Sequence, residues 1–148
     1  MNFVEYDLAF LECSWKWLND PEIKELTDTP VITREIQVAW FDSLKNKPDY
    51  KVWGVENENE KIGVVGLKNI SDGRGEYFGY IGEKTYWNKG LGKYMINHVC
   101  AIAKENGLKE IWLRVLKSNE RAVKAYLKYG FITYSESDTA FLMCYNLV

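Results

Sequence analysis

The sequence lacks a long apolar run, a secretion signal and a cysteine framework. No stretch of about 18 or more apolar residues occurs, and the segment Met1–Asp7 has no basic region followed by an apolar block. The three cysteines, Cys13, Cys100 and Cys144, are odd in number and lie among apolar residues. That setting favours core packing in a reducing compartment over disulfides. These absences predict a soluble cytoplasmic protein that does not act at a membrane.

The chain also has little net charge and almost no histidine. Its 19 basic and 21 acidic side chains form no long run of either sign, which argues against a nucleic-acid-binding surface. The single histidine, His98, falls in the middle of a predicted helix without partners at suitable spacing. Neither a Ser-His-Asp triad nor a metal site is therefore expected. We assign His98 a structural or surface role.

What is present is enough apolar surface for one compact domain over residues 1–148. Hydrophobic residues make up 47% of the chain and aromatic residues 15%, which suffices for a real core. Periodicity and turn signals predict strands at 3–6, 51–56, 61–70, 76–82, 110–116, 131–134 and 140–147. Helices are predicted at 8–18, 21–26, between 33 and 46, at 90–106 and from 118 or 119 to 129. This order indicates a layered α+β domain.

The segment 80–99 leads from a strand into a helix through Gly90 and Gly92. The first turn of a helix leaves backbone N–H groups without partners, so a phosphate would bind there. Glycine at both positions removes side chains that would keep it out. A third glycine is missing, and Tyr94 stands where a Walker loop needs Ser or Thr, so neither standard nucleotide motif applies. By itself the segment predicts an anion site.

A second pattern covers Asn119–Phe131, where Asn119, Ala122 and Tyr126 share one side of a helix. Alone, the pattern is better explained by a capping asparagine and an ordinary packed tyrosine. With Trp87-Asn-Lys-Gly-Leu-Gly before it, the chain resembles the GNAT superfamily of N-acetyltransferases. These enzymes carry Gln/Arg-x-x-Gly-x-Gly/Ala at the acetyl-CoA pyrophosphate loop and Asn-x-x-Ala-x-x-x-Tyr-x-x-x-Gly-Phe later. Trp87 departs from Gln/Arg, although Tyr-Trp-Asn-Lys-Gly is similar to the form common in the RimJ/RimL-like branch.

The resemblance implies a mixed, mostly antiparallel seven-stranded sheet with four or five flanking helices. The sheet would splay between the strands at 76–82 and 110–116, and acetyl-CoA would lie in the splay as the acetyl donor. The backbone of Tyr80, Ile81 and Gly82 would hold the pantetheine and thioester. The pyrophosphate would lie on the loop of Asn88, Lys89, Gly90, Leu91, Gly92 and Lys93, with Arg121 adding charge. Asn119 and Tyr126 complete the expected cofactor-binding set.

Acetyl transfer needs a donor for the developing oxyanion and a proton for the departing thiolate. Backbone N–H groups at Ile81 or Gly82 can serve the oxyanion. By its match to the family position, Tyr126 is the expected general acid. Its ordinary pKa of about 10 leaves it protonated at neutral pH.

The general base is less clear, because Arg114 occupies the position where ribosomal-protein acetyltransferases of this superfamily carry a glutamate. Glu76 is the first candidate, acting through a water, and Glu83 is the second. RimJ/RimL-like relatives have their acid one position later, where Tyr77 stands, and a one-residue offset reverses the strand face. A solvated carboxylate at the strand end is the alternative for Glu76.

The start Trp-Lys-Trp-Leu-Asn-Asp-Pro at 15–21 resembles both RimJ/RimL-like enzymes and nucleotide-aminosugar N-acetyltransferases. Trp15, Trp17, Asn19 and Asp20 are candidates for the acceptor site, with core packing the favoured alternative for Trp15. The predicted function is acetyl transfer to a primary amine of a small molecule, with a nucleotide-linked aminosugar favoured. The alternatives are protein N-terminal acetylation and a non-catalytic acyl-CoA-binding module. No metal is implied, and a homodimer is compatible with the resemblance.

Overall fold

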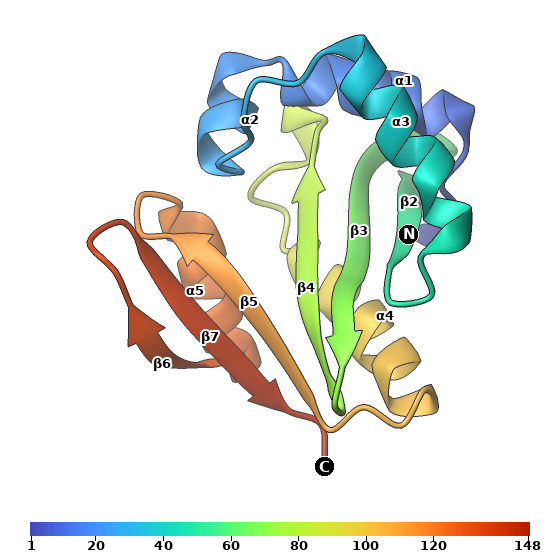
Figure 1. The fold of residues 1–148 in the computed structure, drawn as a ribbon. Coiled ribbons are helices and arrows are strands. Elements are labelled where there is room, and N and C mark those ends of the chain that lie inside the picture. Colours follow the sequence, from blue (N-terminus) through green and yellow to red (C-terminus); the bar gives the residue numbers. More distant parts are fainter.

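The computed structural model describes residues 1–148, whose strands form one sheet in the order β1-β2-β3-β4-β5-β7-β6 (Figure 1). The strands are β1 (Asn2–Glu5), β2 (Lys51–Asn57), β3 (Glu60–Ser71), β4 (Arg74–Ile81), β5 (Glu110–Leu116), β6 (Ile132–Glu136) and β7 (Ala140–Asn146). All neighbours are antiparallel except β4 and β5. The expected mixed, mostly antiparallel seven-stranded sheet is confirmed.

Five helices flank the sheet, with α1, α2 and α3 on one face and α4 and α5 behind the other (Figure 1). They are α1 (Leu8–Leu18), α2 (Pro21–Leu26), α3 (Arg34–Ser43), α4 (Gly92–Glu105) and α5 (Glu120–Tyr129), with short 3-10 turns η1 (Leu44–Asn46) and η2 (Lys84–Tyr86). Side chains of Asp7, Asp20 and Thr33 accept backbone N–H bonds at the first three helix starts. No helix is long and apolar enough to cross a bilayer.

The core has two parts, one on each face of the sheet. The larger part packs α4 against the sheet, and the smaller lies under α1 and α2. Successive residues of β3 divide between them, since Val64 belongs to the smaller part and Val65 to the larger, as strand alternation requires. All three cysteines are free; Cys100 is buried, whereas Cys13 and Cys144 are only half-buried.

Two predicted boundaries are corrected by backbone conformation. The helix expected from Gly90 begins at Gly92, because Gly90 has φ +69° and lies outside the helical region. The strand expected from Glu76 begins at Arg74, because Asp72 and Gly73, with φ of 53° and 77°, make a turn tight enough to start pairing at once.

The strands β4 and β5 are paired only at their beginnings. Three pairs join them, the last being Glu76 with Trp112. Beyond that point β4 stays paired with β3 and β5 stays paired with β7, and the two strands diverge (Figure 1). Residues 77–81 of β4 therefore have no strand on their outer side. The splay that the resemblance implies is confirmed.

Candidate active site

The unpaired edge of β4 presents two free N–H groups to the opening between β4 and β5. Backbone polar groups alternate in direction along an antiparallel strand. The N–H of Gly82 donates to the Ile62 carbonyl at 2.7 Å. The backbone N–H and C=O groups of even-numbered residues in this stretch therefore point toward β3. The N–H groups of Gly79 and Ile81 point away from β3, where β5 has diverged. Of the two expected oxyanion donors, Ile81 is free and Gly82 is occupied.

The loop before α4 carries a run of unpaired N–H groups. None of the backbone N–H groups from Asn88 to Lys93 donates a hydrogen bond to a protein acceptor. Asn88 and Gly90 adopt φ of 62° and 69°, which turns the chain sharply into the helix. A Cβ atom placed on Gly90 or Gly92 would meet nothing within 4 Å. The loop therefore leaves open space in front of free donors at a helix start.

Three basic side chains near this loop have no acidic partner. Lys89, Lys93 and Arg121 take part in none of the salt bridges of the structure. The Arg121 guanidinium instead lies 4.3 Å from the ring centre of Trp87. Uncompensated positive charge beside free N–H groups fits the diphosphate of a coenzyme A molecule.

Tyr126 extends from α5 toward the opening and contacts two aromatic rings. Its ring centre lies 5.9 Å from that of Tyr77 on β4 and 5.6 Å from that of Phe131. Burial raises the pKa of Tyr126 well above its ordinary value, so the hydroxyl stays protonated at neutral pH. Nothing in the protein accepts its proton, which leaves the hydroxyl available to a bound molecule.

Asn119 stands immediately before α5 but does not cap it, contrary to one prediction. Its side chain makes no bond to the helix start, and its Nδ2 donates instead to the Leu26 carbonyl at 3.4 Å. That bond joins α5 to the end of α2 across the opening. A second bridge lies nearby, where Arg114 of β5 contacts Asp28 at 2.8 Å.

The two candidate bases lie in different places. Glu76 stands at the last β4–β5 pair, on the face opposite Tyr77, where Asn69 Nδ2 donates to its carboxylate at 2.8 Å. Lys68 is 4.0 Å from the same group. The Glu83 carboxylate lies under α1 and accepts from Trp17 Nε1 at 2.9 Å. Glu76 is therefore beside the opening, whereas Glu83 is held by α1.

The expected acceptor residues on α1 and before α2 have structural contacts instead. Trp17 is buried, and Asp20 caps α2 and contacts Lys84 at 2.9 Å. Asn19 bonds the Trp15 carbonyl. Trp15 is half-buried under the Arg34 guanidinium rather than in the core, so the core prediction for Trp15 is wrong.

A polar groove of about 750 Å³ lies between α2 and the ends of β5 and β7. Ten residues line it: Pro21, Lys24, Glu25, Asp28, Thr29, Leu116, Lys117, Ser118, Asp138 and Thr139. They come from separate parts of the chain and carry no motif, so no sequence pattern points to them.

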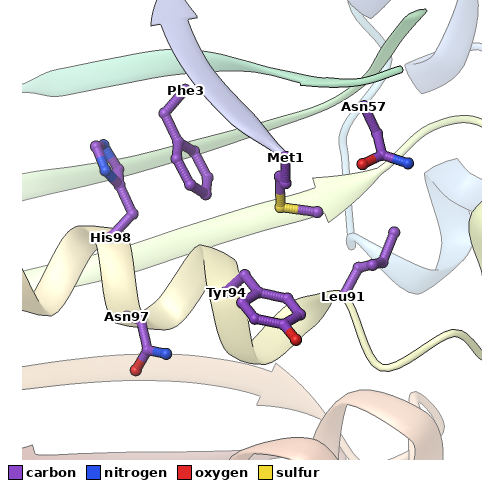
Figure 2. Close-up of a pocket in the computed structure, with 7 residues that line it drawn as sticks. All are labelled: Met1, Phe3, Asn57, Leu91, Tyr94, Asn97 and His98. Carbon is purple, nitrogen blue, oxygen red and sulfur yellow. The ribbon is translucent and has the colours of Figure 1, made fainter.

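A second cavity, of about 590 Å³, lies between β1 and α4 (Figure 2). Phe3, Tyr94 and His98 are among its lining residues. His98 stacks on Phe3 with 4.1 Å between ring centres and meets Trp53 edge-on at 4.6 Å. Burial lowers the pKa of His98, which keeps the imidazole neutral. Leu91 of the loop before α4 also lines the cavity, whereas no residue of β4 or β5 does.

Comparison with known proteins identifies the family of this chain. The model of the acetyltransferase (GNAT) family matches residues 13–131. Acetyltransferase PseH of Campylobacter jejuni is 30% identical over 145 residues, spanning 97% of this chain and 90% of its own length.

Solved structures share the fold. The C. jejuni N-acetyltransferase PseH in complex with acetyl coenzyme A aligns with a TM-score of 0.74 and 22% identity over 96% of this chain and 93% of its own. A Vibrio cholerae spermidine N-acetyltransferase in complex with CoA and spermine aligns with a TM-score of 0.88 and 18% identity over 99% of this chain and 95% of its own. On the family match and the PseH similarity, this chain belongs to the GNAT family, as an N-acetyltransferase that transfers acetyl from acetyl-CoA to an amine.

Proposed function

We propose that this enzyme acetylates the primary amine of a small molecule, and that the amino group of a nucleotide-linked aminosugar is the first acceptor to test. The mechanism rests on two hydrogen-bonding groups without a protein partner, one on each side of the opening between β4 and β5. The Ile81 N–H lies on β4 and the Tyr126 hydroxyl on α5, and neither has a protein partner. The aminosugar itself rests on the sequence resemblance.

The cofactor is held through groups that the fold leaves free. The N–H groups of residues 88–93, with Lys89, Lys93 and Arg121, bind the pyrophosphate. The free edge of β4 at Gly79 and Ile81 takes the pantetheine, in place of the expected Tyr80 backbone, which is paired with Val64 on β3. Asn119 holds α5 beside this edge. When bound, acetyl-CoA supplies a thioester carbonyl that an amine can attack and a thiolate that can leave.

The reaction is a direct displacement in which each proton has a stated place. The amine nitrogen forms a bond to the carbonyl carbon, and the bond from that carbon to sulfur breaks. The Ile81 N–H donates to the carbonyl oxygen as it gains negative charge. Tyr126 gives its proton to the departing thiolate, since its raised pKa keeps it protonated. Glu76 is the proposed acceptor of the proton of the attacking amine. Because it lies five residues before Ile81 on β4, about 16 Å along the strand, a chain of waters carries the proton to it.

The groove beside α2 is the proposed acceptor site. Its volume of about 750 Å³ lies in the range of pockets that hold small molecules. Its lining residues are mostly charged or hydroxyl-bearing, so they offer polar partners to an acceptor. The Arg114–Asp28 pair lies at its edge.

The test is free thiol release from acetyl-CoA over a panel of amines. The panel holds aminosugar nucleotides, polyamines, aminoglycosides and peptides with free N-termini, and mass spectrometry identifies the acetylated product. We expect turnover with an aminosugar nucleotide. Turnover confined to peptides would replace this function with protein N-terminal acetylation. Bound coenzyme A in native mass spectrometry with no turnover on any amine would support a non-catalytic acyl-CoA-binding module.

A further inference from the structure

The residue that departs from the family motif, Trp87, contacts the end of β4. Its Nε1 donates to the carbonyl of Ile81 at 2.8 Å. Ile81 is the last residue of β4, and its carbonyl points away from β3, as its N–H does. No strand is present on that side. Trp87 therefore supplies the partner that a neighbouring strand would otherwise provide.

This contact fixes the peptide that follows Ile81 at both of its polar atoms. The carbonyl oxygen is bound by Trp87, and the N–H of Gly82 donates to Ile62 at 2.7 Å. The peptide that precedes Ile81 is fixed by the pairing of Tyr80 with Val64. Only the Ile81 N–H remains free, and the bonds on either side of it determine its direction.

The indole of Trp87 is itself held from several sides. The Arg121 guanidinium lies 4.3 Å from the ring centre and the Lys84 ammonium 5.8 Å from it. The ring also packs against the core cluster under α1 and α2. Because α5, β4 and the first helices all contact it, the indole has little freedom to move its N–H away from Ile81.

We propose that Trp87 is a positioning residue for acetyl transfer, which fixes the Ile81 carbonyl so that the Ile81 N–H is held toward the reacting carbonyl oxygen. The inference rests on the proposed function, which gives the Ile81 N–H its role. A donor held in place stabilises developing charge without first reorienting, so a loosened donor lowers the rate of the chemical step more than it weakens binding.

The decisive variant is Trp87→Phe, which keeps an aromatic ring under Arg121 and removes the N–H donor together with the five-membered ring of the indole. We expect kcat to fall about tenfold or more, while the KM for acetyl-CoA and for the acceptor stays within about twofold. In the free protein, we expect faster amide hydrogen exchange at Gly82, because its peptide loses one of its two bonds.

Trp53→Phe is the matched control. Trp53 lies on β2, where its ring meets that of His98 edge-on at 4.6 Å, and its indole N–H makes no hydrogen bond to the protein. Its replacement should leave kcat and the exchange at Gly82 unchanged.

Three outcomes would overturn the positioning role. The first is a wild-type kcat in Trp87→Phe. The second is a rise in both KM values together with a lowered thermal midpoint, which would show that the variant destabilises the whole fold. The third is unchanged exchange at Gly82. Exchange is measured without substrate, so it still decides the role of Trp87 if no amine is acetylated and the proposed function fails.

Discussion

The ring of Tyr126 meets the ring of Tyr77 edge-on, with 5.9 Å between centres and 79° between planes. Tyr77 is the first residue of β4 beyond the last β4–β5 pair, and Tyr126 lies on α5. The contact thus joins β4 to α5 at the point where β4 and β5 begin to diverge. Burial raises the pKa of both hydroxyls, and the Tyr77 ring holds Tyr126 in place on the side of α4.

Replacement of Tyr126 by Phe should separate chemistry from binding. The ring contacts with Tyr77 and Phe131 remain, and only the hydroxyl is lost. We expect kcat to fall by about 10²-fold or more, the usual contribution of a general acid, with little change in coenzyme A affinity by calorimetry. A kcat equal to that of the wild type would remove Tyr126 from this role.

Tyr129→Phe is the control for that variant, because Tyr129 lies on the same helix. Its hydroxyl donates to Asn97 Oδ1 on α4 at 2.6 Å, away from the opening. We expect a loss of at most about 1 kcal/mol in unfolding free energy and a kcat within about twofold of the wild type.

Glu76→Gln tests the proposed base. The amide keeps an oxygen for the bond from Asn69 but accepts no proton at neutral pH. We expect kcat/KM to fall by about 10²-fold. Glu110→Gln is matched, since Glu110 is also a strand glutamate with a side-chain partner, Arg74 at 3.0 Å. A similar loss in both variants would point to sheet stability and away from a base.

The sequence predicted the parts of the site that depend on neighbouring residues. Helix starts at Asp7, Asp20 and Thr33 follow from side-chain oxygens near unpaired N–H groups. The loop at Gly90 is equally local, because the glycine provides the positive φ that the turn uses. The splay was expected from resemblance, since periodicity alone does not show where two parallel strands part.

The sequence could not predict contacts between distant segments. Asp28 and Arg114 are separated by 86 positions and meet at 2.8 Å, and Asp28 lines the groove beside α2. No periodicity or spacing encodes such a pair. Trp15 and Trp17 show a second limit, because residues two apart on a helix face different directions. Trp17, an acceptor candidate, is buried, and Trp15, for which core packing was favoured, is only half-buried.

Removal of the two loop lysines should weaken cofactor binding without slowing chemistry. In Lys89→Ala with Lys93→Ala, we expect the KM for acetyl-CoA to rise about tenfold with kcat unchanged. The difference in this KM between the double variant and the wild type should shrink at high salt, because salt screens exposed charges. Turnover of S-acetylpantetheine, which lacks the pyrophosphate, should be unaffected. Lys104→Ala, at the far end of α4, should match the wild type with both donors.

His98 gives the stability of the fold a pH dependence of predictable sign. Burial lowers its pKa below the ordinary 6.5, against a weaker opposing effect of Glu105. The unfolded chain therefore binds a proton at a higher pH than the folded chain does, and stability is lost as the pH falls below about 6.5. His98 is the only histidine, so few other side chains titrate between pH 7.5 and 5.5.

Urea unfolding across that range measures the effect of His98. We expect the wild-type unfolding free energy to fall with decreasing pH, with a slope of at most about 1.4 kcal/mol per unit. His98→Gln loses the stacking on Phe3 and should be less stable throughout, but its unfolding free energy should be flat over the same range. The wild type and His98→Gln are compared by the slope of unfolding free energy against pH. The loss of packing in the variant therefore does not affect the conclusion. Equal slopes would show that the imidazole titrates alike in the folded and unfolded chain, and would contradict the burial of His98 between Phe3 and Trp53.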